Sequence, residues 1–189
     1  MTTLLEYLTH KRTAFRLLRQ RALASGYEPL AIRAEVTVEG RSGVRRIRLR
    51  DHQVLSDSPR DFVGYDLGPS SPELALGALG SCLAHSWLIQ AAAQGVPLRA
   101  LEVRVSGQLD QRAAEPGHED TPREPHGIAY TVHVESDADA AAIDALHASV
   151  ERLCPVLNLL RRPQAVAGSV HHDRPEPEPA RSLSPEGVA

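Results

Sequence analysis

The hydrophobic pattern first predicts a basic amphipathic helix over residues 3–24. Thr3 and Glu6 have the spacing of a capping box, and Gly26 is placed to end the helix. We expect this extension, residues 1–26, to pack on the rest of the chain or on a second subunit, and a membrane-surface or transit role is the alternative. Its apolar residues fall roughly on one face: Leu4, Leu8, Phe15, Leu18 and Ala22.

Alternation of apolar and polar positions marks the strands. The turn Gly40-Arg41-Ser42-Gly43 joins the first two strands into a predicted hairpin, whereas residues 56–71 and the acidic, proline-rich residues 111–126 indicate loops. The pattern predicts five strands, over residues 31–39, 44–50, 98–109, 127–135 and 165–170.

The longest apolar segment predicts a helix over residues 72–94. Ser71 is placed to cap this helix and Gly95 to end it. Because the segment is apolar almost all round, we expect it to be buried on most sides. Its many small residues would let another element approach closely.

A second helix begins at Asp137 or Asp139 and must end or kink at Cys154-Pro155, because the residue before a proline is disfavoured in a helix. A short helical turn through Leu159 follows. The order of these elements is an α+β pattern of hairpins with one unusually buried helix.

Composition fits one compact domain, which we place at residues 27–172. The chain has 189 residues, of which 42% are hydrophobic and 24% charged. Residues 173–189 are rich in Pro, Glu and Ser, which predicts disorder. The net charge of -3 gives no reason to expect nucleic acid. We also expect no membrane-spanning stretch, no export signal and a cytoplasmic location.

Two cysteines are the candidates for chemistry. Cys82 lies in the middle of the buried helix, where a cysteine is more often a small core residue than a nucleophile. Cys154 would be the N-cap of the turn that starts at Pro155, where free backbone N–H groups favour a thiolate. The alternative is that Cys154 only completes the apolar stripe of the preceding helix.

Charged residues near a thiol would tune it. Glu73 precedes Cys82 by nine positions and forms a Ser70-x-x-Glu73 capping box, but its carboxylate could also hold an arginine. An arginine beside a thiol lowers the thiol pKa and gives oxyanions a donor fork. Arg41 in the hairpin turn is one candidate, and two others compete with it: Arg33 and Arg60.

Metal and acyl-transfer chemistry have little support. Cys82-x-x-His85 could supply two zinc ligands, but a closed zinc site needs two more, and no fourth ligand recurs at a suitable spacing. Gly80-Ser81-Cys82 is not a nucleophile elbow. We therefore expect neither a metal nor a bound cofactor.

Three segments of the chain together resemble the OsmC/Ohr family of peroxide-resistance proteins, and its OsmC-like branch in particular. The similarity extends from about Ile32 to Val170 and is quite specific as a combination. The segments are PSSPELALGALGSCLAHSWLIQAAAQG, LRALEVRVSGQLD and VERLCPVLNLL.

The resemblance implies an α+β fold in which antiparallel sheets wrap around a long buried central helix, and two chains intertwine as a homodimer with sites at the interface. It implies that Cys82 is the peroxidatic cysteine and Cys154 the resolving one. Glu73 and Arg41 would polarise the first thiol.

The resemblance therefore implies a thiol-dependent peroxidase for organic hydroperoxides. Cys82 would become a sulfenic acid, Cys154 would resolve it to a disulfide, and an external dithiol would reduce the disulfide. The alternative is a non-enzymatic dimeric protein that binds a small molecule and whose thiols are incidental.

Overall fold

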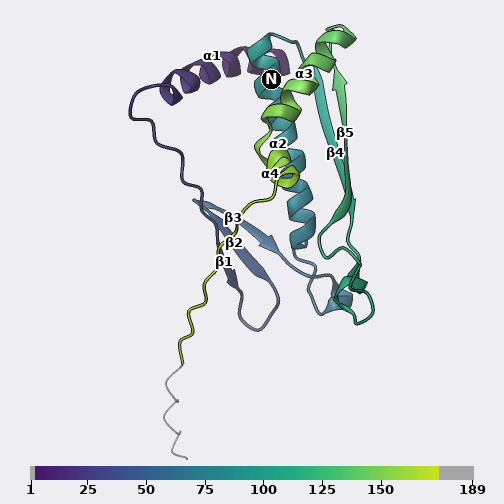
Figure 1. The fold of residues 1–189 in the computed structure, drawn as a ribbon. Helices are drawn as coiled ribbons and strands as arrows, with labels where there is room; N and C mark the ends of the chain where they lie inside the picture. Colours follow the sequence, from purple (N-terminus) through teal and green to yellow (C-terminus); the bar gives the residue numbers. More distant parts are fainter. Residues whose placement is uncertain (1–2, 175–189) are drawn as a thin grey trace, which may run out of the picture.

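A computed structural model describes residues 3–174 (Figure 1), so most of the tail predicted for residues 173–189 lies outside the described residues. Two short 3-10 turns, Arg60–Phe62 and Gln111–Ala114, supplement the main elements. These are α1 (Leu4–Ala22), β1 (Glu35–Val38), β2 (Arg45–Leu49), β3 (His52–Ser56), α2 (Ser71–Gln94), β4 (Ala100–Gln108), β5 (His126–Glu135), α3 (Ala140–Leu153) and α4 (Pro155–Arg161).

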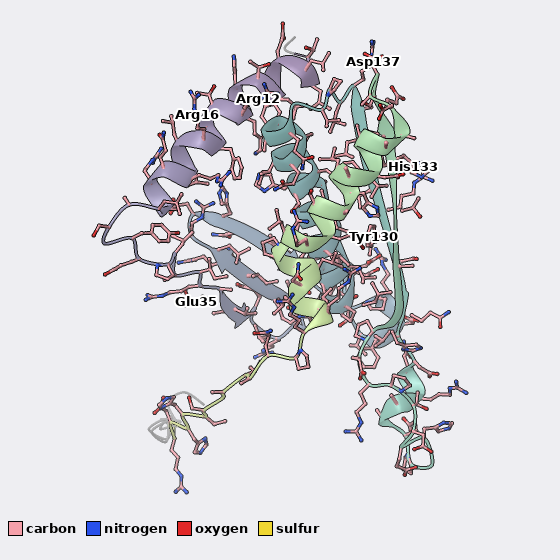
Figure 2. The ribbon with its side chains drawn as sticks, turned by 45° about the horizontal axis from the view of Figure 1, so that its top comes forward. Arg12, Arg16, Glu35, Tyr130, His133 and Asp137 are labelled. Atoms are coloured by element: carbon pink, nitrogen blue, oxygen red, sulfur yellow. The ribbon has the colours of Figure 1, made fainter. Side chains whose placement is uncertain are left out.

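The N-terminal helix forms as predicted and packs on α2. Thr3 caps α1, and the Thr3–Glu6 capping box is complete. Leu8 is buried against α2, and the Arg12 Nε donates to the Ala92 carbonyl at 2.6 Å. Figure 2 shows Arg12 on the side of α1 next to α2. Because the last turn of α2 has no basic residue of its own, Arg12 supplies the positive charge that its free carbonyls favour.

The central helix α2 begins one residue earlier than predicted, and Ser70 rather than Ser71 is its N-cap. Ser70 is the correct cap because Glu73 stands three residues later and completes the box. Gly95 ends the helix with a φ of 77°, a conformation that glycine adopts without strain.

The core lies where α2 meets the β4–β5 hairpin on one side and α3 and α4 on another (Figure 1). The strands pair antiparallel, with Val103 opposite Val132 and Val105 opposite Tyr130. Gly80 lets the helix approach the sheet closely, because a side chain there would meet Val105. The largest core residues include Leu79, Leu83, Trp87, Leu98, Leu146 and Val150.

A second, three-stranded sheet has the order β1–β2–β3 and confirms the predicted hairpin. The sequence pattern missed β3, which immediately follows β2 through a tight turn at Arg50 and Asp51. This sheet lies beyond the end of the helical layer (Figure 1), so much of its apolar surface is uncovered. Val36 and Val38 are 56% and 66% exposed.

The strand predicted for residues 165–170 is wrong for the structure described. Residues 162–174 are extended and exposed, without regular secondary structure. A strand needs a neighbouring strand to satisfy its backbone groups, and these residues leave the body of the chain after α4. The α+β class and the antiparallel sheets are confirmed.

By length and composition, α2 is apolar enough to cross a membrane, so the expectation of no such segment is wrong in that narrow sense. The core helix of a globular protein passes the same test, and α2 packs against α1, β4, α3 and α4.

Truncation of the core tests this packing. Leu83→Ala removes a side chain with no exposed surface and leaves a cavity, so it should lower the free energy of unfolding by about 2–5 kcal/mol. Leu23→Ala is the matched control, because Leu23 is 81% exposed. Urea unfolding should show a large loss of unfolding free energy for Leu83→Ala only. Equal losses in the two variants would contradict the described core.

Candidate active site around two cysteines

The helix break at Cys154-Pro155 organises the site. Proline has no N–H to continue the helical ladder and disfavours the helical conformation in the preceding residue, so α3 ends at Leu153 and α4 begins at Pro155. Cys154 is both the C-cap of α3 and the N-cap of α4, as the sequence predicted for α4. Its side chain is turned into the core, and the residue is fully buried.

The Asn158 amide fixes this break. Its Nδ2 donates to the Cys154 carbonyl at 2.8 Å and also reaches the carbonyls of Glu151 and Arg152, at 3.2 and 3.3 Å. These carbonyls belong to the end of α3, where a helix lacks internal donors. The position of Cys154 therefore depends on a side chain from the following helix.

The structure brings Cys82 and Cys154 together. Cys82 is half-buried in the middle of α2 and packs against the core cluster that contains Cys154. Both thiols are free. Burial raises the pKa of the Cys82 thiol, and the neighbouring Cys154 thiol raises it further. Two groups oppose this change and lower the Cys82 pKa: the Val156 backbone N–H and the Ser86 hydroxyl.

The N-terminal amides of α4 therefore assist a different cysteine from the one expected. The sequence predicted that these amides favour a thiolate at Cys154, but the Cys154 side chain makes no capping hydrogen bond. The Val156 N–H in the first turn of α4 instead faces Cys82. Sequence reasoning missed both Val156 and Ser86. Ser86 had a detectable signal, because it lies four residues after Cys82 and so on the same face of α2.

Glu73 lies away from the thiols of its own chain. Its Oε2 accepts from the Ser70 N–H and the Ser70 hydroxyl, both at 2.7 Å, and these bonds lower the Glu73 pKa, the hydroxyl contributing most. Nine helical residues separate it from Cys82, which amounts to about 13 Å along the axis and roughly half a turn around it. Within one chain Glu73 acts as a helix cap.

Arg41 is also remote from the cysteines, on the exposed turn between β1 and β2. An arginine of this sheet that the sequence did not single out, Arg45, is ordered beside the loop that precedes α2. Its Nη2 donates to the Ser56 hydroxyl and the Asp57 carbonyl, both at 3.0 Å. Asp57 is buried and accepts three backbone N–H bonds, of which that from Ser58 contributes most to lowering its pKa.

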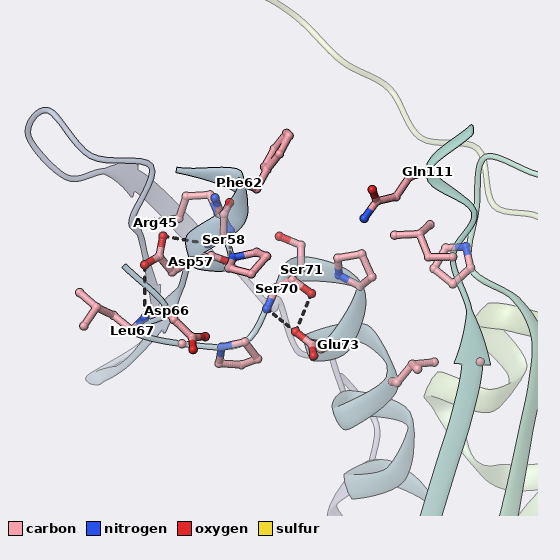
Figure 3. Close-up of a pocket in the computed structure, with 18 of the residues that line it drawn as sticks. Arg45, Asp57, Ser58, Phe62, Asp66, Leu67, Ser70, Ser71, Glu73 and Gln111 are labelled. Atoms are coloured by element: carbon pink, nitrogen blue, oxygen red, sulfur yellow. Dashed lines mark hydrogen bonds between the residues drawn. The ribbon is translucent and has the colours of Figure 1, made fainter. Parts of the chain in front are cut away.

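Glu73 and Arg45 line the same cleft of about 990 Å³, together with Asp57 and Phe62 (Figure 3). Its lining comes from the loop before α2, the start of α2 and the ends of β4 and β5. Neither cysteine belongs to it. The four predicted site residues thus form one thiol pair, one cleft carboxylate and one hairpin arginine.

His85, the other residue of the Cys82-x-x-His85 spacing, contacts α1 instead of a metal ligand set. Its Nε2 lies 2.8 Å from the Lys11 Nζ. Burial lowers the His85 pKa, and the Lys11 charge adds to this effect. Within residues 3–174, no three His, Cys, Asp or Glu side chains gather as a metal site would require.

Comparison with known proteins identifies the class. A sequence model of the OsmC-like protein family matches residues 64–167, which is more than half of the chain and includes both cysteines. The chain belongs to this family. No curated protein gives a significant sequence match.

Solved structures show the same fold. The chain is similar to an OsmC-like protein from Mycoplasma pneumoniae, with a TM-score of 0.61 and 16% identity over 71% of this chain and 89% of that one. It is also similar to an organic hydroperoxide resistance protein OsmC from Legionella pneumophila, with a TM-score of 0.51 and 17% identity over 71% and 92%. At these identities the likeness concerns the fold alone.

Reactivity of Cys82 should follow the groups around it. Because burial raises its pKa, its thiolate forms only as pH rises, and its alkylation rate should increase throughout the range from neutral to alkaline pH. Ser86→Ala removes a donor to the thiolate and should move this profile to higher pH, which slows alkylation at neutral pH by about threefold to tenfold.

Peptide mapping of iodoacetamide-treated protein would measure this rate for Cys82 separately. Ser71→Ala is the matched control, because Ser71 is an exposed serine at the start of the same helix, far along it from Cys82. An unchanged profile in Ser86→Ala would show that the hydroxyl does not support the thiolate.

Proposed function

We propose that the chain is a thiol-dependent peroxidase that reduces organic hydroperoxides. The observation that carries the proposal is the placement of Cys82 and Cys154 as neighbouring free thiols where α2 meets the α3–α4 break. A sulfenic acid formed on one sulfur would find the second thiol without a large rearrangement, and close approach is what disulfide geometry requires.

The proposed cycle has three balanced steps. The Cys82 thiolate attacks the distal oxygen of the hydroperoxide, the O–O bond breaks, and the alkoxide takes a proton to leave as an alcohol. Cys154 then attacks the sulfenic sulfur, and the S–S bond forms as water leaves. An external dithiol reduces this disulfide by two exchange steps and is itself oxidised. The cysteine sulfur gives two electrons to the peroxide, and the disulfide regains two from the dithiol, so no cofactor is required.

Among residues 3–174, the groups that act on the Cys82 pKa include no cation, and burial dominates it. The Cys82 thiolate therefore needs a cation from elsewhere. We propose that a homodimer supplies it, with Arg41 and Glu73 of one copy approaching Cys82 of the other. Two exposed surfaces support this assembly. One is the β1–β3 sheet with Val36 and Val38, and the other is a stripe of small residues on α2: Ala75, Gly77, Ala78 and Ser81. We place this activity in the cytoplasm, whose dithiols would return the protein to its reduced form.

A second candidate is non-enzymatic binding of a small molecule. The large cleft that contains Glu73 but neither cysteine favours it, as does a Cys82 thiol whose burial disfavours the thiolate. Under this alternative the thiols would be packing residues.

Thiol counting distinguishes the two. Reduced protein treated with cumene hydroperoxide should lose both of its thiols, one per cysteine of the chain. Cys82→Ser should abolish the loss, because Cys154 is fully buried and only resolves. Cys154→Ser should still oxidise and should hold a sulfenic acid that dimedone traps. No thiol loss within minutes in excess peroxide would rule out the peroxidase and leave the binding function.

The source of the cation can be tested on the hairpin. Arg41→Met should slow oxidation of Cys82 by about tenfold or more, because a cation beside a thiol favours the thiolate. Arg48→Met is the matched control, because it is an exposed arginine on the same hairpin, in β2. Stopped-flow measurement of sulfenic acid formation gives the rates. Equal effects of the two variants would exclude Arg41, and a single-chain mass in solution would exclude the assembly.

A further inference from the structure

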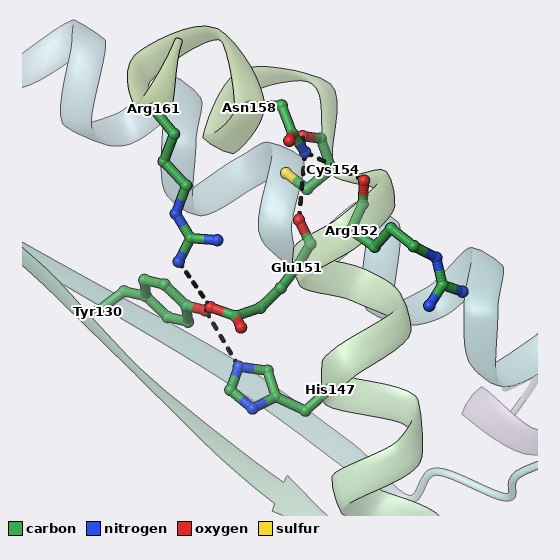
Figure 4. A network of polar contacts seen from close by, with 7 residues as sticks. All are labelled: Tyr130, His147, Glu151, Arg152, Cys154, Asn158 and Arg161. Carbon is green, nitrogen blue, oxygen red and sulfur yellow. Dashed lines mark hydrogen bonds and ion pairs between the residues drawn. The ribbon is translucent and has the colours of Figure 1, made fainter.

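A network of polar side chains lies beside Cys154 and has no part in the predicted site. The Glu151 carboxylate is its centre, because its Oε1 accepts from the Tyr130 hydroxyl and from the Arg161 guanidinium, each at 2.7 Å. The Tyr130 hydroxyl also lies 3.0 Å from the His147 Nε2. Figure 4 shows these side chains converging from β5, α3 and α4 on the region below the helix break.

The aromatic members hold the network in place. The His147 ring stacks on Trp87 of α2, with ring centroids 5.8 Å apart and planes inclined by 18°. Tyr130 meets the same imidazole edge-on at 6.1 Å. Trp87 is almost completely buried, so the stack is anchored in the core. Glu151 is therefore fixed between a buried aromatic cluster and a cation at the end of α4.

The charged groups of this network lie near Cys154 (Figure 4). Glu151 lies three residues before Cys154 and Arg161 seven residues after it, which places both on the turns that flank the break. Burial raises the Tyr130 pKa to about 12, with further contributions from Glu151 and from Cys154. Glu151 raises the Arg161 pKa most, and Cys154 also contributes. Groups from three other elements thus lie close to Cys154: Cys82 from α2, Tyr130 from β5 and Arg161 from α4. Glu151 of α3 is bonded to the last two.

We propose that Arg161 is a positioning residue for the resolving step. Its guanidinium, held in place by Glu151, stabilises the Cys154 thiolate as this sulfur attacks the Cys82 sulfenic acid. The negative charge of the Glu151 carboxylate disfavours the thiolate, and the bonds of this carboxylate to Arg161 and Tyr130 reduce that effect. The role deepens the proposed peroxidase function and rests on it, but the effect of Arg161 on Cys154 can be measured without any peroxide.

The first experiment therefore omits peroxide. In a Cys82→Ser background, the rate of Cys154 alkylation by iodoacetamide is measured against pH, with thiolate ultraviolet absorbance as a second readout. Arg161→Met should move the profile to higher pH and slow alkylation at neutral pH by about threefold to tenfold, a modest effect because the pair is partly exposed. Glu151→Gln should move the profile to lower pH, and the profile of Arg161→Lys should stay close to that of the parent.

The opposite signs separate charge from structure. Loss of packing would move the Cys154 alkylation profile in the same direction in Arg161→Met and in Glu151→Gln, since both variants break the same ion pair. Arg99→Met is the control, because it breaks the similarly exposed Arg99–Asp137 pair at 2.6 Å, away from the cysteines. Shifts of the same sign, or shifts no larger than that of Arg99→Met, would overturn the role of Arg161. Glu151→Gln and Arg161→Lys preserve side-chain volume and keep the test decisive if Arg161→Met folds poorly.

The second experiment uses the full chain and cumene hydroperoxide. Arg161→Met should slow disulfide closure more than it slows formation of the Cys82 sulfenic acid, so that dimedone captures about threefold to tenfold more sulfenic acid than in the parent. Equal capture would overturn the inference. Absence of any sulfenic acid in the parent would instead refute the peroxidase, and the alkylation profiles would then decide the role of Arg161 alone.

Discussion

The whole arrangement depends on the break in the helical chain at Cys154-Pro155. Proline lacks the N–H that would continue the helix, so the chain breaks after α3, and α4 packs on α2 instead of extending α3. That break buries Cys154, brings the Val156 N–H to Cys82, and places Asn158 on the free carbonyls of α3.

Burial then sets the chemistry of the pair. The core that encloses Cys82 disfavours its charged form, and one backbone amide and one hydroxyl only partly compensate. A nucleophilic thiol here needs further positive charge, and three ordered arginines among the described residues are bonded to other groups. Arg45 stabilises the loop after β3, Arg12 caps α2, and Arg161 is engaged with Glu151. This shortage of positive charge near Cys82 is why the proposed function requires a second copy of the chain.

Local signals in the sequence predicted most elements correctly. The Thr3–Glu6 and Ser70–Glu73 capping boxes, the hairpin turn and the proline break are all short-range features, and each is found where it was expected. The failures concern strands whose existence depends on a partner outside their own segment. β3 has little pattern of its own and exists by pairing with β2, whereas residues 165–170 have the pattern of a strand and nothing beside them.

The sequence by itself determined the family, the two cysteines and the helices that carry them, because these follow from motif, periodicity and capping within short segments. Only the tertiary structure decided which groups surround each thiol. Packing between elements brings Val156, Tyr130 and Arg161 to the cysteines. Helical geometry separates Glu73 from Cys82 despite their closeness in sequence. Burial and hydrogen bonding across elements depend on three-dimensional contacts, which a one-dimensional pattern does not encode.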